Sequence, residues 1–180
     1  PVYTKQGTWR EIQDKLIVPK NRLIELTKGS LTLGSLIVEP FSVSHDAADP
    51  IGINVFAGNN KATIVTDTGV ISDNILRRID DTTLLVLEAN YDPHMLRFGP
   101  YQPFLKQRVA SDEGHLSNEM AAQALLMMKR PDFMQVILAH RSENNNNAVL
   151  VTQTIGKMLV DGGVRIGPEM KLQHGQPNEI

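Results

Sequence analysis

The stretch Phe41-Ser-Val-Ser-His45-Asp-Ala-Ala-Asp-Pro50 starts with residues that alternate as in a strand and ends in a histidine and two carboxylates. Two later apolar runs end in the same way, one at Asp67 and one at His140. Polar residues gathered where strands stop are candidates for a functional site. Neutral imidazole and carboxylate groups bind zinc, manganese or iron, so the sequence predicts a metal site formed by His45, Asp67 and His140.

The composition is that of a globular chain. Its 180 residues are 41% hydrophobic, which fits a single domain spanning residues 1–180. The chain has no cysteine, which excludes disulfides and thiolate metal sites and is compatible with a reducing cytoplasm, where we expect the protein. No apolar run approaches the roughly 18 residues that span a bilayer, so we expect no membrane partner. The net charge of -2 gives no overall attraction to nucleic acid.

The order of predicted elements indicates a mixed α/β fold. A meander and a hairpin come first, and strands then alternate with helices, which favours a mixed sheet with helices packed against it. The predicted strands are residues 22–26, 31–33, 36–38, 39–44, 51–56, 61–66, 82–87, 133–139 and 164–166. The predicted helices are one capped by Thr8, one capped by Ser72, an interrupted helix over 93–109, one capped by Ser117, and 148–159. Residues 173–180 are expected to form a loose tail.

Five motifs occur in an order that resembles the metallo-β-lactamase-fold hydrolases. They are His45 with Pro50-Ile-Gly52, Thr66-Asp67-Thr-Gly69, Leu84-Leu-Val-Leu-Glu88-Ala-Asn90, Gly114-His115-Leu-Ser117 and Ala139-His140-Arg-Ser142. The spacing of these motifs is similar to that in ribonuclease Z. Their amino-acid sequences, over about residues 39–147, more closely resemble those of the bacterial YycJ (VicX, WalJ) group. The resemblance implies an αββα sandwich, two sheets between helices, with two divalent metal ions at its rim.

The resemblance also implies roles for individual residues. His45 corresponds to a ligand of one metal ion, Asp67 to the bridging carboxylate and His140 to a ligand of the other ion. Glu88 and His115 correspond to a catalytic pair that moves a proton to the leaving group. The YycJ group is linked with exonuclease action on DNA, so the resemblance implies a nucleic acid substrate.

One motif of that family is absent from these 180 residues. The histidines are His45, His94, His115, His140 and His174, and none has the spacing of the His-x-His-x-Asp-His metal cluster. The chain also opens in a strand-like manner without methionine, so we expect the C-terminal portion of such a sandwich, without its N-terminal sheet and first metal motif. We therefore expect weak metal binding and little activity from this polypeptide alone, and an apolar surface that promotes self-association.

Several candidate residues have a structural alternative. Asp67 is followed by Thr-Gly, which is common turn chemistry, and His115 stands at a predicted helix start. Ser117 and Asn118 are either helix caps or phosphate contacts. Ser142 and Asn145 either support His140 or contact phosphate.

The function that these residues indicate best is a metal-dependent phosphodiesterase or nuclease, with DNA exonuclease action as its specific form. The second half of the chain is locally basic, which is typical either of a solvated helix face or of a nucleic-acid patch. The residues concerned are Arg97, Lys106, Arg108, Lys129 and Arg130. The alternatives are a thioesterase or lactonase on the same fold, and a non-catalytic interaction module.

Overall fold

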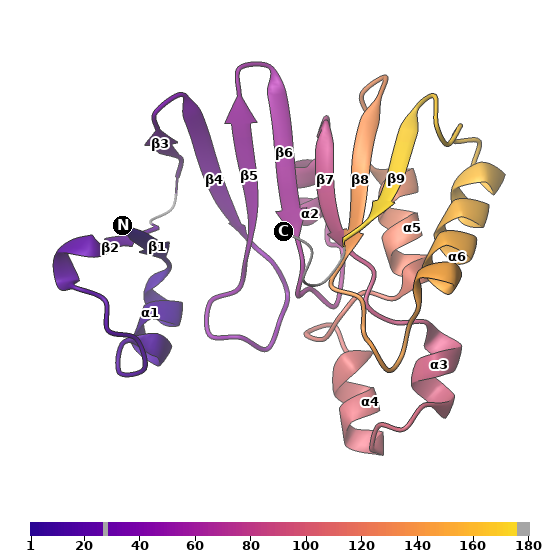
Figure 1. Ribbon diagram of the computed structural model, residues 1–180, viewed down its shortest axis with the longest axis horizontal. Helices are drawn as coiled ribbons and strands as arrows, with labels where there is room; N and C mark the ends of the chain where they lie inside the picture. Colours follow the sequence, from indigo (N-terminus) through magenta and orange to yellow (C-terminus); the bar gives the residue numbers. More distant parts are fainter. Residues whose placement is uncertain (27–28, 176–180) are drawn as a thin grey trace.

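A seven-stranded sheet forms the centre of the computed structural model, which describes residues 1–26 and 29–175 (Figure 1). Its strand order is β3-β4-β5-β6-β7-β8-β9, antiparallel from β3 to β6 and parallel from β6 to β9. The strands are β3 (Leu31–Leu33), β4 (Leu36–Ser42), β5 (Ile51–Ala57), β6 (Asn60–Val65), β7 (Leu84–Glu88), β8 (Met134–Ala139) and β9 (Met170–His174). The expected mixed α/β fold, with a meander followed by alternating strands and helices, is therefore confirmed.

The helices that cover this sheet lie on one of its faces (Figure 1). Side chains at alternate positions of the strands, such as Leu85 and Leu87 of β7, are fully buried against them. The described part of the chain contains the helices α1 (Gln6–Ile12), α2 (Asp73–Ile79), α3 (Pro93–Phe98), α4 (Pro103–Val109), α5 (Asn118–Met127) and α6 (Ala148–Asp161), and a short 3-10 helix at Lys20–Arg22. The core thus forms between the sheet and α2, α5 and α6.

The opposite face of the sheet is also apolar. Pro40, Ile53, Ile64, Val86 and Ile137 are successive register partners across five strands and share this face. In the part of the chain that the structure describes, no helix of the core packs on it, and Ile64 remains 42% exposed.

Two predicted helix caps are confirmed, and a third is wrong. The Ser72 and Ser117 hydroxyls accept hydrogen bonds from backbone amides at the starts of α2 and α5. Thr8, by contrast, lies inside α1 and does not cap it. A distant carboxylate takes that place, because Asp49 accepts hydrogen bonds from the backbone amide of Gly7 and from the Lys5 ammonium. This contact spans more than 40 residues, so no local pattern indicates it.

The N-terminal strands and the end of the chain also differ from the prediction. The strand predicted over 22–26 is β2 (Leu23–Glu25), which pairs in parallel with β1 (Val2–Thr4) outside the large sheet. Residues 164–166 form only an isolated bridge at Ile166, and the last strand is β9, which pairs with β8. Part of the predicted tail thus belongs to the sheet, and residues 176–180 lie outside the described residues. No helix in residues 1–26 and 29–175 is long and apolar enough to cross a bilayer.

Candidate metal centre

The predicted site residues meet at the edge of the sheet where three parallel strands end. Asp67 follows β6, Glu88 is the last residue of β7, and His140 follows β8. His45 lies in the β4–β5 connection, and His115 lies between α4 and α5. Parallel strands present their carboxyl ends at one edge, so side chains far apart in sequence converge there.

The carboxylate of Asp67 lies within reach of two imidazoles, each of which could share an ion with it. Among the described residues, the donor atoms that all lie within 4.8 Å of one another are those of His45, Asp67 and His115 and those of Glu88, His115 and His140. The Nε2 atoms of His45 and His140 lie 3.7 and 3.6 Å from the same oxygen, Oδ1 of Asp67. These separations are too long for hydrogen bonds, but two ligands that are each about 2.0–2.2 Å from one ion stand at such a distance. The predicted convergence of His45, Asp67 and His140 is therefore present.

Hydrogen bonds at the other ring nitrogens orient these two imidazoles. Nδ1 of His45 lies 3.0 Å from the backbone carbonyl of Gly114, and Nδ1 of His140 lies 2.7 Å from Oε1 of Glu88. Each acceptor holds a proton on Nδ1 and leaves the lone pair of Nε2 directed at Asp67. The donor set of neutral imidazoles and a carboxylate fits zinc, manganese or iron.

The backbone at Asp67 and His140 is unusual. Both have a positive φ, 56° and 52°, in the left-handed region that non-glycine residues seldom adopt. Asp67 stands two residues after the end of β6, and His140 stands directly after β8. Backbone strain of this kind costs on the order of 1–3 kcal/mol and persists where the surrounding structure requires it.

His115 lies between the other two imidazoles. Its ring centroid is 5.1 Å from those of His45 and His140, and its Nδ1 is 2.7 Å from Oε1 of Glu88. His115 also has a ring nitrogen within 4.8 Å of donor atoms of His45 and Asp67. The structure thus brings His115 to the site in a position compatible with either proton transfer or metal ligation.

Glu88 is the buried anion of the site. Its side chain is fully buried, and Oε2 accepts a hydrogen bond from the Thr68 amide. Burial opposes ionisation of Glu88, but the hydrogen bonds from His115 and His140 outweigh it and hold its pKa below the usual value. The hydrogen bond to Glu88 in turn raises the pKa of His140, against the effect of burial.

A salt bridge between Arg108 and Asp46 lies at the rim of the site, and the sequence did not predict that these two residues pair. Arg108 of α4 donates from Nε and Nη2 to the carboxylate of Asp46, which holds the pKa of Asp46 below its usual value. Asp46 Oδ1 also lies 3.5 Å from Nε2 of His45. The sequence predicts that Asp46 orients its loop or supports a metal ligand and that Arg108 belongs to a basic surface, but 62 residues separate them and no local pattern pairs them.

The four predicted substrate contacts differ in their exposure. Ser142 is half-buried and lines the site, whereas Ser117, Asn118 and Asn145 are buried. Ser117 caps α5, and the Asn118 amide donates to Asn146. The predicted cap is present at Ser117, whereas Asn118 bonds Asn146 and Asn145 donates to the Ser142 hydroxyl rather than to His140.

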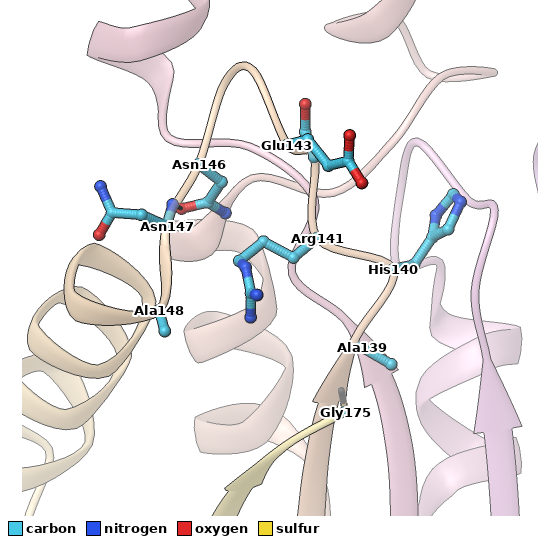
Figure 2. A pocket seen from close by; sticks show the side chains of 9 residues that line it. Ala139, His140, Arg141, Glu143, Asn146, Asn147, Ala148 and Gly175 are labelled. Carbon is cyan, nitrogen blue, oxygen red and sulfur yellow. Dashed lines mark hydrogen bonds between the residues drawn. The ribbon is translucent and has the colours of Figure 1, made fainter. Parts of the chain in front are cut away.

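Two cavities flank the loop that follows β8. The larger, about 570 Å³, lies between the ends of β8 and β9 and the start of α6. Figure 2 shows that the Arg141 side chain extends into this space, whereas the His140 ring points away from it. The smaller cavity, about 370 Å³, opens on the other side beside His115 and His140. The four residues His140, Arg141, Ser142 and Glu143 thus line both cavities, one on each side of the loop.

Comparisons with known proteins identify the fold first. The β-lactamase superfamily domain matches residues 1–140 of this chain. A solved structure of the metallo-β-lactamase fold protein YhfI from Bacillus subtilis superposes with a TM-score of 0.69 at 13% identity, over 98% of this chain and 62% of that one. The chain therefore has the metallo-β-lactamase fold, which implies divalent metal ions, and it spans less than two thirds of YhfI.

Curated relatives then identify the family. The chain is 33% identical to "Exodeoxyribonuclease YycJ" of Bacillus anthracis over 98% of its own length and 68% of the relative. It is 30% identical to "Exodeoxyribonuclease WalJ" of Streptococcus pneumoniae serotype 2, over 98% of its own length and 67% of that relative. The chain thus belongs to the family of YycJ and WalJ within the β-lactamase superfamily.

Proposed function

We propose that this protein is a metal-dependent phosphodiesterase that degrades DNA from an end, as the names of its YycJ and WalJ relatives suggest. The observation that carries the proposal is the position of Asp67 Oδ1, 3.7 and 3.6 Å from the Nε2 atoms of His45 and His140. This arrangement provides a bridging carboxylate between two imidazoles, which a phosphodiesterase with two metal ions requires.

The metal ions are assigned to His45, Asp67 and His140. Two divalent ions lower the pKa of a water molecule towards neutrality and stabilise the charge that develops on a phosphodiester. Glu88 and Gly114 keep the imidazoles of His140 and His45 in the tautomer that exposes Nε2. Zinc and manganese both suit these nitrogen and oxygen donors, as does iron.

We assign to His115 the role of donating a proton to the leaving group. Its Nδ1 is bonded to the ionised Glu88, so Nε2 is the atom that delivers a proton. The buried carboxylate accepts the hydrogen bond of Nδ1 and so fixes the ring nitrogen that faces the site. Ser142, which lines the site, is the residue we assign to contact phosphate. Ser117, Asn118 and Asn145 support the wall around it.

Hydrolysis of bis-p-nitrophenyl phosphate tests this assignment. The protein as its gene encodes it, loaded with manganese or zinc, is expected to turn over this phosphodiester, and His140→Ala is expected to abolish turnover. His94→Ala is the matched control, because His94 is an exposed histidine on α3 outside the site. Turnover of a thioester or lactone without phosphodiester turnover would support the other hydrolase class instead, and no turnover of any of them would support a non-catalytic module.

A further inference from the structure

A small cavity adjoins the candidate metal centre on the side of α4. Its volume is about 370 Å³, and His115 and His140 form one of its walls. Tyr101, Leu105, Val109 and Asn144 form much of the remainder. Ligand pockets for small molecules begin at about 300 Å³, so the space suits one nucleotide-sized group and excludes a duplex.

Tyr101 is held in a fixed position at this cavity. It lies in the α3–α4 connection, between Pro100 and Pro103, which restrict the backbone. The ring packs against the buried cluster that contains Leu96 and Val109, and its hydroxyl accepts a hydrogen bond from Nδ2 of Asn144 at 3.5 Å. An aromatic ring that is packed against a buried cluster binds a planar group with less loss of conformational entropy than a mobile side chain would.

The chemistry of the lining suits a base better than a phosphate. Near Tyr101 the cavity presents the apolar side chains of Leu105 and Val109 and the amides of Asn90 and Asn144. Two arginines also line it, but the guanidinium of Arg108 is paired with Asp46 and the side chain of Arg141 extends into the cavity on the other side of the loop (Figure 2). Flat aromatic rings and amides recognise the face and edges of a nucleobase, whereas a phosphate requires free cationic donors.

We propose that this cavity receives the nucleobase at the end of a single nucleic-acid strand, with Tyr101 as the surface on which the base stacks. The inference rests on the proposed phosphodiesterase function and specifies its substrate as an unpaired strand end. The base lies beside His115 and His140, so the adjoining phosphodiester lies at the metal centre. Any base offers a π-face, so stacking on Tyr101 tolerates every sequence.

A double-mutant cycle tests the proposal. Binding of a fluorescently labelled single-stranded oligonucleotide is measured by anisotropy in the presence of a chelator, with either a normal or an abasic terminal nucleotide. The wild-type protein is expected to bind the normal end about tenfold more tightly, since one base stacked on an aromatic ring contributes at that level. Tyr101→Leu is expected to remove this preference and Tyr101→Phe to keep it. The ratio compares two ligands on one protein, so partial unfolding does not change it.

The control is Phe98→Leu, which removes an exposed aromatic ring of α3 that does not line the cavity. Phe98→Leu is expected to retain the tenfold preference. The proposal is overturned if the wild-type protein shows no preference or no binding, if Tyr101→Leu keeps the preference, or if Phe98→Leu removes it. Binding is read without turnover, so hydrolysis of bis-p-nitrophenyl phosphate without the preference refutes only this inference. The preference without hydrolysis refutes only the proposed function.

Discussion

Glu88 connects His115, the proposed proton donor, with His140, the proposed metal ligand. A single oxygen, Oε1, accepts hydrogen bonds from Nδ1 of both His115 and His140, each at 2.7 Å. Its other oxygen accepts a hydrogen bond from the Thr68 amide, so both oxygens of this buried carboxylate are hydrogen-bonded. Because the carboxylate fixes both tautomers, the two imidazoles present Nε2 to the metal centre before any substrate arrives.

Glu88→Gln is expected to weaken metal binding about 10- to 100-fold, the usual effect of losing a partner that orients a ligand. Glutamine has one acceptor oxygen and a donor NH₂ group, so it cannot accept from Thr68 and both imidazoles together. Competition with a chromophoric chelator at fixed pH measures the affinity. Glu113→Gln, at an exposed glutamate next to the site, is the control. An affinity for Glu88→Gln within twofold of wild type would contradict the assigned role.

Arg141→Ala is expected to weaken binding of single-stranded DNA and to reduce its dependence on salt. Arg141 extends into the cavity behind His140, where a neighbouring phosphate of the strand can reach it (Figure 2). Loss of one phosphate contact lowers the slope of log K against log salt by about 0.7. Arg77→Ala on α2 removes an exposed arginine remote from these cavities and is expected to leave the slope unchanged. An unaltered slope in Arg141→Ala would exclude a phosphate at this position.

The residues at the site were predictable to the extent that they stand at strand ends. His45, Asp67 and His140 follow apolar runs, and that position alone indicated a common edge. The left-handed backbone at Asp67 and His140 has no local signal, because both follow ordinary strands. The Asp46–Arg108 pair depends on the docking of α4, which no sequence spacing reveals.

At the level of elements, apolar runs and serine caps predicted β7, β8, α2 and α5, because burial on both faces of a strand and local capping act within a few residues. Elements stabilised by distant partners were not predictable. The start of α1 depends on Asp49, and β9 depends on hydrogen bonds from β8. Tertiary contacts therefore decided the elements that local patterns missed.

Asn146 connects three elements through its hydrogen bonds, whereas the sequence pattern indicates only that it belongs to a polar loop. Its Nδ2 donates to the carbonyls of Ala89 and Asn90 after β7 and to Asn118 at the start of α5, and its Oδ1 accepts from the Asn147 amide before α6. Asn146→Ala leaves these groups buried without a partner and is expected to lower the free energy of unfolding by about 2–3 kcal/mol. Urea unfolding measures it. Asn144→Ala, at an exposed position, is expected to cost less than about 0.5 kcal/mol. A similar cost for both would contradict this role.

His174 couples the attachment of β9 to pH. Burial, together with the nearby Arg141 cation, holds the pKa of His174 below its usual value. Its Nε2 is bonded to Thr152 of α6, and within the described part of the chain its buried Nδ1 has no partner, so a second proton is unfavourable. The unfolded chain then binds a proton at higher pH than the folded chain. Stability therefore falls as the pH drops from about 7 through the ordinary histidine pKa near 6.5 towards the lower folded value.

His174→Gln is expected to remove this dependence. The difference in thermal midpoint between pH 7.5 and pH 5 should be smaller in the variant than in the wild-type protein. His94→Gln, at an exposed histidine of α3, should change the protein as little at pH 5 as at pH 7.5. An equal loss of stability in wild type and His174→Gln over this interval would show that other groups cause it.

For the molecule as a whole, the apolar row on the second face of the sheet predicts self-association. Pro40, Ile53, Ile64, Val86 and Ile137 lie side by side across five strands, and the core helices lie on the other face (Figure 1). Contiguous apolar surface of this kind is rare on soluble monomers, because its burial releases on the order of 25 cal/mol per Å². The 180-residue polypeptide is therefore expected to form dimers or larger species in light scattering at micromolar concentration.

A charge at the centre of this row should oppose association. Ile64→Lys places an ammonium group between Ile53 and Val86, its register partners on both sides, and is expected to shift the scattering mass towards the monomer. Met127→Lys adds the same charge at a residue of α5 that is 69% exposed, away from the row, and should leave the mass unchanged. Association that persists in Ile64→Lys but is lost in Met127→Lys would place the contact on the helical face. A monodisperse wild-type monomer would show that this row of side chains is compatible with exposure to water.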